Sequence, residues 1–256
     1  MLAVERRNLI LEELQKNKKV IVSDLAKSFD VSEETIRRDL DRLDRDGLAI
    51  KSYGGAVINE NTNIDMPFNV RKKKNTVGKQ RIAEIINTLI DDGDHIILDP
   101  STTAVFIARA LKEKNRLTVI TNSIEVIIEL ADVSDWNIIA SGGSVKEGYL
   151  ALVGPQAVKG LGAYNVEKTI ISCKGLDINK GVTDGNELFS EAKQAMIRSA
   201  RQRILAADHT KFDTLAFSKI CDVSDLDIVV TDIRPEERWI EFFESKNIRL
   251  LYPDSP

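Results

Sequence analysis

The feature that most constrains the fold of this chain is a regular alternation of helical and strand patterns that begins near residue 78. A helical pattern at about residues 78–90 leads to an apolar run at 95–98, and helical and apolar segments then alternate up to residues 136–140. Strands joined in this way by helices pair in parallel, with helices covering both faces of the sheet. Further strands of the same sheet are predicted from the apolar runs at 169–172, 204–207, 227–231 and 248–251. Residues 76–256 are therefore expected to form an α/β domain with a mainly parallel sheet.

The first 58 residues show a different pattern, that of three short helices followed by a hairpin. Apolar side chains at helical spacing predict the first helix. Two more helices are expected to begin with Ser23 and Ser32 as their N-caps. Residues 48–58 are expected to form two short strands around a turn at Gly54 and Gly55. Together these elements predict a winged helix-turn-helix domain, which is mainly α-helical with a small β-hairpin.

The distribution of charge also separates the two parts of the chain. The whole chain carries a net charge of -4, which by itself argues against binding to nucleic acid. However, residues 1–58 are neutral and residues 71–81 carry six bases and no acid, whereas residues 82–256 carry 19 bases and 27 acids. This asymmetry is expected when one domain binds an anion and the other has a different task. The polar residues 59–75, which show no periodicity, are expected to form the linker.

The third predicted helix carries the side chains best suited to contact DNA. Its buried side is expected to comprise Ile36, Leu40 and Leu43. Arg38 then lies on the opposite side, where its guanidinium can donate two hydrogen bonds to a guanine. The candidate DNA-binding residues of this helix and of the hairpin are Ser32, Glu34, Thr35, Arg37, Arg38, Arg42 and Lys51.

The alternative interpretation of this helix is an ordinary solvated surface. In that case Glu34 with Arg38 and Asp41 with Arg45, each four residues apart, form ion pairs worth only about 0.2–0.5 kcal/mol. A three-helix unit of this kind can also serve for dimerisation or for docking another protein.

Polar and glycine-rich segments follow three successive strands of the predicted sheet. In a parallel sheet a ligand binds beyond the carboxyl ends of the strands, where amides at helix N-termini attract anions. Each segment alone can be an ordinary helix cap or turn, but their coincidence at three strand ends predicts a ligand site. The candidate residues are Asp99, Ser101, Thr102, Thr103, Thr121, Asn122, Gly142 and Gly143.

A resemblance to a known family rests on motifs in the first 58 residues. Arg6, Ile10 and Leu14 recur at four-residue intervals, residues 32–40 read SEETIRRDL, and the hairpin ends in Gly-Gly-Ala. These motifs resemble the DNA-binding signature of the DeoR family of bacterial transcriptional repressors. The resemblance spans nearly the whole chain, and it implies a C-terminal effector domain related to sugar-phosphate isomerases. It also implies two partners, a double-stranded DNA operator of a carbohydrate-utilisation operon and a phosphorylated sugar effector. Because one winged helix recognises only a short stretch of DNA, a homo-oligomer, a dimer or a tetramer, is also expected.

The same resemblance implies further residues of the effector site. Lys174 and Asp208 match a region that lines the pocket in the family, and Lys211 looks like the base that pairs with a ligand phosphate. Glu191 and Lys193 also match this region. The family has a glycine where this chain has Ser101, which leaves the backbone path of that loop open.

The alternative from another functional class is a sugar-phosphate isomerase-like enzyme with an accessory helical domain. Asp99, Asp208, Glu191 and Lys211 include groups suited to acid–base catalysis. However, no pairing of a nucleophile with a base is evident, and a fused DNA-binding domain gives the pocket another use. The expectation is therefore a regulator without enzymatic activity.

The sequence predicts neither a metal nor a cofactor. His95 and His209 are far apart in the sequence, and Cys173 and Cys221 lack the spacing of metal ligands. The two cysteines are expected to be reduced thiols in a cytoplasmic protein, because the sequence shows no signal peptide and no apolar run of about 20 residues.

Overall fold

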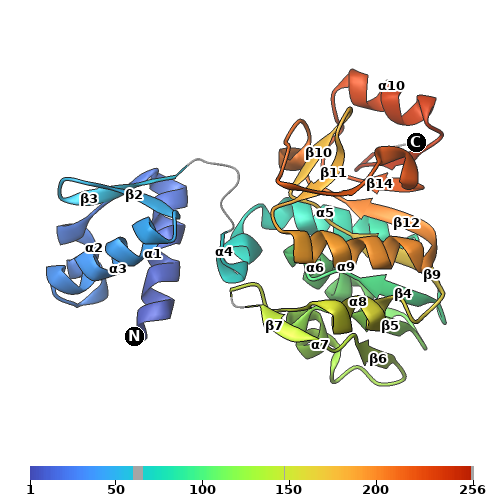
Figure 1. Cartoon of the computed structure of the whole chain (residues 1–256), viewed down its shortest axis with the longest axis horizontal. Helices are drawn as coiled ribbons and strands as arrows, with labels where there is room; N and C mark the ends of the chain where they lie inside the picture. Colours follow the sequence, from blue (N-terminus) through green and yellow to red (C-terminus); the bar gives the residue numbers. More distant parts are fainter. Residues whose placement is uncertain (60–65, 147, 255–256) are drawn as a thin grey trace. The chain divides into compact units, whose positions relative to one another are not determined.

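The computed structural model describes residues 1–59, 66–146 and 148–254, which belong to two compact units, Met1–Lys74 and Asn75–Pro256 (Figure 1). The N-terminal unit contains helices α1 (Ala3–Asn17), α2 (Val22–Phe29) and α3 (Glu33–Arg45). Its antiparallel sheet has the strand order β1 (Lys19–Ile21), β3 (Gly55–Ile58) and β2 (Ala49–Ser52). Three helices followed by a small hairpin confirm the expected winged helix-turn-helix fold.

Helix α3 is positioned as its sequence predicts. Ser32 is the N-cap, and its Oγ accepts a hydrogen bond from the backbone amide of Thr35 at 3.2 Å. Ile36, Leu40 and Leu43 are buried in the core of the unit together with residues of α1 and α2. This packing fixes which side of α3 is left exposed.

The structure corrects three details of this unit. Strand β1 was not expected, and because Lys19–Ile21 pairs with β3, α2 begins at Val22 with Ile21 as its N-cap instead of Ser23. The hairpin turns one residue earlier than predicted, since Gly55 already pairs with Ser52. A side chain at Gly55 is excluded by β1, because its Cβ would lie 2.0 Å from the carbonyl oxygen of Val20.

Part of the expected linker is a helix, α4 (Phe68–Lys73). Its Val70 is buried in the core of the N-terminal unit, and Lys73 forms an ion pair of 2.8 Å with Glu12 of α1. Six residues are too few to show a helical period, so the sequence pattern did not reveal this helix. Residues 60–65 of the expected linker lie outside the described residues.

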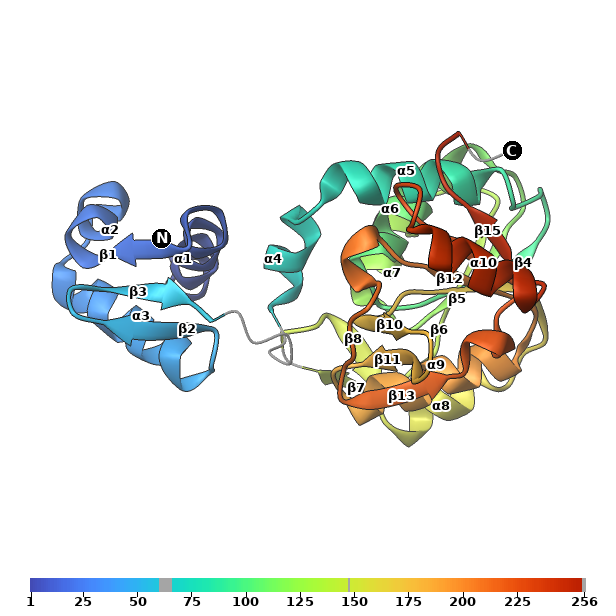
Figure 2. The same ribbon diagram turned by 90° about the horizontal axis from the view of Figure 1, so that it is seen from above.

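The C-terminal unit is built around a seven-stranded sheet in which each described pair of neighbouring strands is parallel, and the predicted α/β fold is confirmed. The strand order is β15 (Arg249–Leu251), β14 (Ile228–Val230), β12 (Ala200–Ala206), β9 (Val166–Ile171), β4 (His95–Leu98), β5 (Thr118–Thr121) and β6 (Asn137–Ala140). Figure 2 shows α5 (Thr76–Asn87) and α6 (Thr102–Ala110) on one face of the sheet and α8 (Pro155–Leu161) and α9 (Glu187–Arg198) on the other. Two further helices are α7 (Ile124–Leu130) and α10 (Glu237–Ser245).

Two smaller sheets were not expected from the sequence. One is antiparallel and has the order β10 (Gly175–Asp177), β11 (Gly181–Asp184) and β13 (Ser218–Cys221). The other is the hairpin of β7 (Ser144–Lys146) and β8 (Ala151–Val153). Strands of three or four residues carry too little alternation to be distinguished from loops.

The order of the large sheet determines where a ligand can bind. From β4 the chain proceeds through β5 to β6 at one edge, and from β9 through β12 and β14 to β15 at the other, so the direction reverses between the neighbours β4 and β9. In open parallel sheets, ligand sites lie beyond the carboxyl ends of the strands at such a reversal. Among the described residues, no helix is both long and apolar enough to span a membrane.

Candidate functional site

The exposed side of α3 carries most of the side chains that the sequence assigned to DNA. Glu34, Arg37, Arg38 and Arg42 are exposed, and the Arg38 side chain retains 78% of its accessible surface. Thr35 is half-buried, and its hydroxyl lies 2.9 Å from the hydroxyl of Ser32 at the start of the helix. The hydroxyls of these two residues therefore already stabilise the first turn of α3.

The basic side chains of this surface are paired with acidic neighbours. Three pairs link residues four apart on α3 or at its end: Arg37 with Glu33 at 2.5 Å, Arg38 with Glu34 at 3.2 Å, and Arg42 with Asp46 at 3.0 Å. Lys51 of β2 forms an ion pair with Asp41. Asp41 therefore pairs with the hairpin, and Arg45 instead donates a hydrogen bond to the backbone carbonyl of Asp41. Exposed pairs of this kind contribute only about 0.2–1 kcal/mol, so phosphate groups can readily replace the carboxylates.

One functional residue of α3 was missed by the sequence reasoning. Asp39 is 4% exposed and forms a buried ion pair with Arg6 of α1, while Arg7 lies 3.5 Å from its other oxygen. The available signal was its position three residues after Ile36, on the side of the helix that the period assigns to the core. This ion pair holds α3 against α1 and so fixes the exposed surface described above.

In the C-terminal unit, Asp99 lies at the reversal between β4 and β9. It is 1% exposed and accepts hydrogen bonds from the backbone amides of Ser101 at 3.1 Å and Ser172 at 2.8 Å. Ser172 follows β9, so this carboxylate joins the ends of two neighbouring strands. Its Oδ2 also lies 3.2 Å from Nζ of Lys193.

Lys193 of α9 is the cation at the centre of this cluster. Its ammonium donates to the Ser172 carbonyl at 2.7 Å and to Asp184 at 2.6 Å, besides facing Asp99. Burial lowers the pKa of Lys193, but the carboxylates of Asp184 and Asp99 outweigh burial and raise this pKa above its ordinary value of 10.5. Glu191, which the sequence grouped with Lys193, is exposed because it lies two residues earlier on the helix.

The loop after β4 does not need the glycine that the family resemblance led us to expect. Ser101 adopts φ -79° and ψ 159°, an extended conformation open to any residue, and its Oγ caps α6 by accepting from the Ala104 amide at 3.0 Å. Thr102 and Thr103 are buried in the first turn of α6. The backbone path of this loop is therefore that of an ordinary capped helix start, with amides available to an anion.

The residues at the ends of β5 and β6 differ in how many of their hydrogen-bonding groups are already used within the protein. Thr121 donates its hydroxyl to the Leu98 carbonyl at 2.7 Å, and so ties β5 to β4. Asn122 is completely buried and donates to the Leu152 carbonyl at 2.9 Å, whereas its Oδ1 accepts no hydrogen bond from the described residues. Gly142 and Gly143 have φ of +72° and +114°, and a Cβ at Gly143 would lie 2.7 Å from the Val153 carbonyl oxygen.

Two further lysines follow strands of the same edge. Lys211 is half-buried in the 3₁₀ helix η2 (His209–Lys211), which follows β12 and is capped by the buried Asp208. Lys174 is half-buried after β9. Burial raises the pKa of the Cys173 thiol to about 12, although Lys193 and Lys211 both lower it by their charge. Lys211 therefore follows β12, the neighbour of β9 in the sheet, and its charge acts on Cys173 just after β9.

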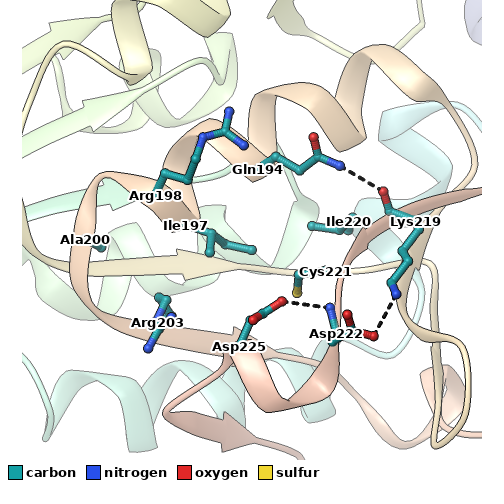
Figure 3. Close-up of a pocket in the computed structure, with 10 residues that line it drawn as sticks. All are labelled: Gln194, Ile197, Arg198, Ala200, Arg203, Lys219, Ile220, Cys221, Asp222 and Asp225. Carbon is teal, nitrogen blue, oxygen red and sulfur yellow. Dashed lines mark hydrogen bonds and ion pairs between the residues drawn. The ribbon is translucent and has the colours of Figure 1, made fainter.

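A hollow of about 560 Å³ lies elsewhere in the unit, at the end of α9 and the start of β12 (Figure 3). Two of its basic side chains already have acidic partners: Lys219 pairs with Asp222 at 2.6 Å, and Arg203 forms a two-point contact with Asp227. Because Ala200 and Arg203 belong to the first half of β12, this hollow is distinct from the carboxyl edge of the sheet. Among the described residues, no group of three or more histidine, cysteine or carboxylate side chains is arranged to hold a metal ion.

Comparison with protein families decides between the alternatives left open by the sequence. Residues 6–62 match the DeoR-like helix-turn-helix domain, and residues 74–233 match the DeoR C terminal sensor domain. The chain belongs to the DeoR family. It is a transcriptional regulator that combines a DNA-binding helix-turn-helix domain with a sensor domain.

Individual relatives agree with this family. The chain is 37% identical to the uncharacterized HTH-type transcriptional regulator YulB of Bacillus subtilis, over 98% of this chain and 96% of the relative. It is 28% identical to the glycerol-3-phosphate regulon repressor of Escherichia coli, over 98% and 99% of the two chains. Among solved structures, ribose 5-phosphate isomerase A of Methanocaldococcus jannaschii matches 52% of this chain and 53% of its own, with 16% identity and a TM-score of 0.39.

Proposed function

We propose that this regulator is a repressor of a carbohydrate-utilisation operon and that a phosphorylated sugar controls its affinity for DNA. The observation that carries the proposal is the buried Asp99 beside the N-terminal amides of α6 at the reversal between β4 and β9, with Lys211 following the next strand, β12. The 28% identical relative is a glycerol-3-phosphate regulon repressor, which supports a phosphorylated metabolite as the signal. The coupling between effector and DNA is typically worth about 1–3 kcal/mol.

In this proposal the effector is held by groups of opposite character. Its phosphate binds near Ser101, Thr103 and Lys211, because amides at a helix N-terminus and an ammonium suit a dianion. Its hydroxyls donate to Asp99 and to the free Oδ1 of Asn122. Thr102, Thr121, Gly142, Gly143, Lys174 and Asp208 complete the proposed site by shaping the same edge of the sheet.

Each part of the chain has its own function in this proposal. Residues 1–58 bind the operator, and residues 76–256 bind the effector and mediate oligomerisation. In the segment 59–75 between them, α4 packs on the N-terminal unit and Asn75 caps α5 of the C-terminal unit. One winged helix reads a short sequence, so a homo-oligomer on paired half-sites is expected. A regulator of chromosomal DNA in a bacterium works in the cytoplasm, the compartment expected from the sequence.

The bonding of the buried acids favours a sensor over an isomerase. Both oxygens of Asp99 accept hydrogen bonds from backbone amides, and Oδ1 of Asp208 accepts from the amide and the hydroxyl of Thr210. A general base must instead be free to reach a substrate proton. The bonding of Asp99 therefore does not suit a general base.

Lys211→Ala is expected to abolish most of the preference for a phosphorylated sugar over the free sugar. Loss of a hydrogen bond to a charged group costs about 1.5–3 kcal/mol, which calorimetry with matched sugar and sugar phosphate can resolve. Lys219→Ala, which removes an exposed lysine at the distinct hollow, is the matched control. If the wild type and both variants bound the free sugar and the sugar phosphate equally well, Lys211 would not belong to the effector site and the phosphate would not be recognised.

Arg38→Ala is expected to weaken binding to the operator by about 1–3 kcal/mol and to relax discrimination at one base pair, because it removes a base contact. Lys51→Ala, on the hairpin, is the comparison, since loss of a phosphate contact weakens all sequences alike and lowers the dependence on salt. Titration of both variants against operator and random duplexes at two salt concentrations separates the two roles. Unchanged operator affinity in Arg38→Ala would show that this arginine does not contact a base of the operator.

A further inference from the structure

One buried carboxylate joins the loop of η2 to the first residue of the C-terminal unit. Asp232, just after β14, is 2% exposed. Its Oδ1 accepts a hydrogen bond from the backbone amide of His209 at 2.7 Å, and its Oδ2 lies 2.8 Å from Nδ1 of the same histidine. Nδ2 of Asn75 donates to Oδ2 at 3.2 Å, across a separation of 157 positions in the sequence.

Asn75 stands where the two units of the chain are joined. It is the first residue of the unit Asn75–Pro256 and the N-cap of α5, and its Oδ1 accepts from the Gly78 amide at 3.3 Å. Its backbone has φ 46° and ψ 49°, the left-handed region that asparagine tolerates better than most residues. The contacts of this side chain therefore act on the backbone of the residue at which the chain passes from one unit to the other.

The contact between Asp232 and the start of α5 leaves no space for a side chain at position 78. A Cβ at Gly78 would lie 2.4 Å from Oδ2 of Asp232 and 2.5 Å from Nδ2 of Asn75. Burial raises the pKa of Asp232, but hydrogen bonds from His209 and Asn75 outweigh burial and lower it below its ordinary value. The carboxylate is therefore charged, and the bonds that it accepts are of the stronger, charge-assisted kind.

At the other end of the connection, His209 belongs to the turn that carries two proposed effector residues. Asp208 precedes His209, and the amides of Thr210 and Lys211 both donate to Asp208. The turn is thus a compact unit in which a shift of Asp208 or Lys211 also moves the His209 amide. That movement reaches Asp232 directly, because this amide is one of its hydrogen-bond donors.

We propose that Asp232 couples occupancy of the effector site at η2 to the conformation of Asn75, and thereby to DNA affinity. This proposal rests on the proposed function, since it takes the effector to bind against η2. A ligand that favours one arrangement of η2 favours the arrangement of Asn75 that Asp232 holds with it, and so shifts the population at the junction.

The test replaces Asn75 with glycine in the full chain. Glycine adopts the left-handed backbone freely and serves as an N-cap, so Asn75→Gly removes chiefly the amide contact with Asp232. The DNA is a duplex that the wild type selects from a random pool. The probe is whichever of glycerol 3-phosphate, ribose 5-phosphate, fructose 6-phosphate and glucose 6-phosphate binds the wild type in calorimetry. In the wild type, saturating probe is expected to change the Kd for the duplex by about 5–150-fold, and in Asn75→Gly this ratio is expected to approach one while the Kd for the probe itself stays close to that of the wild type.

A matched control is provided by the other histidine of the chain. Oε2 of Glu167 accepts from the backbone amide of His95 at 2.9 Å and lies 3.1 Å from its Nδ1, so this carboxylate contacts a histidine at the same two groups as Asp232 does, but at an exposed position at the opposite end of the sheet. In Asp232→Asn, saturating probe is expected to leave the Kd for the duplex nearly unchanged. In Glu167→Gln, the probe is expected to change this Kd as it does in the wild type. Loss of coupling in Glu167→Gln as well would mean that general loosening of the domain, and not this connection, is responsible.

A measurement without ligand separates this proposal from the proposed function. In hydrogen exchange on the free protein, Asn75→Gly is expected to speed exchange of the Thr210 and Lys211 amides several-fold, although these residues are remote in the sequence. Suppose that in Asn75→Gly the probe changes the Kd for the duplex as in the wild type and that the amides of η2 exchange at the wild-type rate. This result would show that Asp232 does not connect η2 to Asn75, and it would leave the effector proposal intact. If no probe binds the wild type, the sugar-phosphate function is overturned, and exchange at η2 alone then decides whether the connection exists.

Discussion

Asp39→Ala is expected to destabilise the N-terminal unit by about 3–5 kcal/mol, a large part of the free energy of unfolding of a small domain. The substitution leaves the guanidinium of Arg6, which is 8% exposed, in the core without its carboxylate. An unpaired buried charge costs more than the ion pair contributes, because the charge has lost its hydration and has no partner in return. DNA binding is expected to fall with stability, since α3 and α1 are held together at this point. Native-state hydrogen exchange of the amides of α1 and α3 in the full chain measures the loss.

Two variants show whether burial is the cause of this effect. Glu34→Ala breaks the exposed pair with Arg38 and is expected to cost about 1 kcal/mol or less. Combining Arg6→Met with Asp39→Leu removes both charges and is expected to be less damaging than Asp39→Ala alone, because no unpaired charge remains. Equal losses in Asp39→Ala and Glu34→Ala would contradict the role given to the buried pair.

The elements that the sequence predicted correctly share one property, a strong local pattern. The buried stripe of Ile36, Leu40 and Leu43 follows the helical period, and the buried strands are continuous apolar runs, as strands covered on both faces must be. The elements that it missed depend on distant partners. Strand β1 is only three residues long and exists because β3 pairs with it, and α4 is recognised by the packing of Val70 into a core formed by residues far earlier in the chain.

The same distinction applies to the candidate sites. Asp99 and Ser101 were found because they follow a strand and begin a helix, which is information local to the sequence. The partners of Asp99 were not found by this reasoning, because Ser172 and Lys193 reach it only through the order of the strands. A charged residue at a position that the helical period assigns to the core, such as Asp39 or Lys193, was a signal available in advance, and for Lys193 the family resemblance was a second one. Such a residue indicates a buried ion pair before its partner can be identified.

Lys193→Met is expected to have the largest effect in the C-terminal unit, a loss of about 3–5 kcal/mol near neutral pH together with loss of effector binding. Methionine keeps much of the length and the apolar body of the side chain but leaves Asp99 and Asp184 facing each other without the cation between them. Lys219→Met, at an exposed pair with Asp222, is the control and is expected to cost about 1 kcal/mol or less.

The pH dependence of Lys193→Met identifies the cause of its instability. In the wild type, the raised pKa of Lys193 means that its contribution to stability is complete below the ordinary value of 10.5 and is lost only as the pH rises through the higher folded-state value. Between pH 5 and 8 this group therefore gives the wild type no pH dependence. In Lys193→Met the repulsion between the two carboxylates is no longer compensated by a cation, and acid relieves this repulsion, so the deficit in stability is expected to shrink as the pH falls toward 5. Urea unfolding at several pH values, followed by the fluorescence of Trp239 and Trp136, measures this, and a deficit that stays constant from pH 8 to 5 would show that lost packing, not uncompensated charge, destabilises the variant.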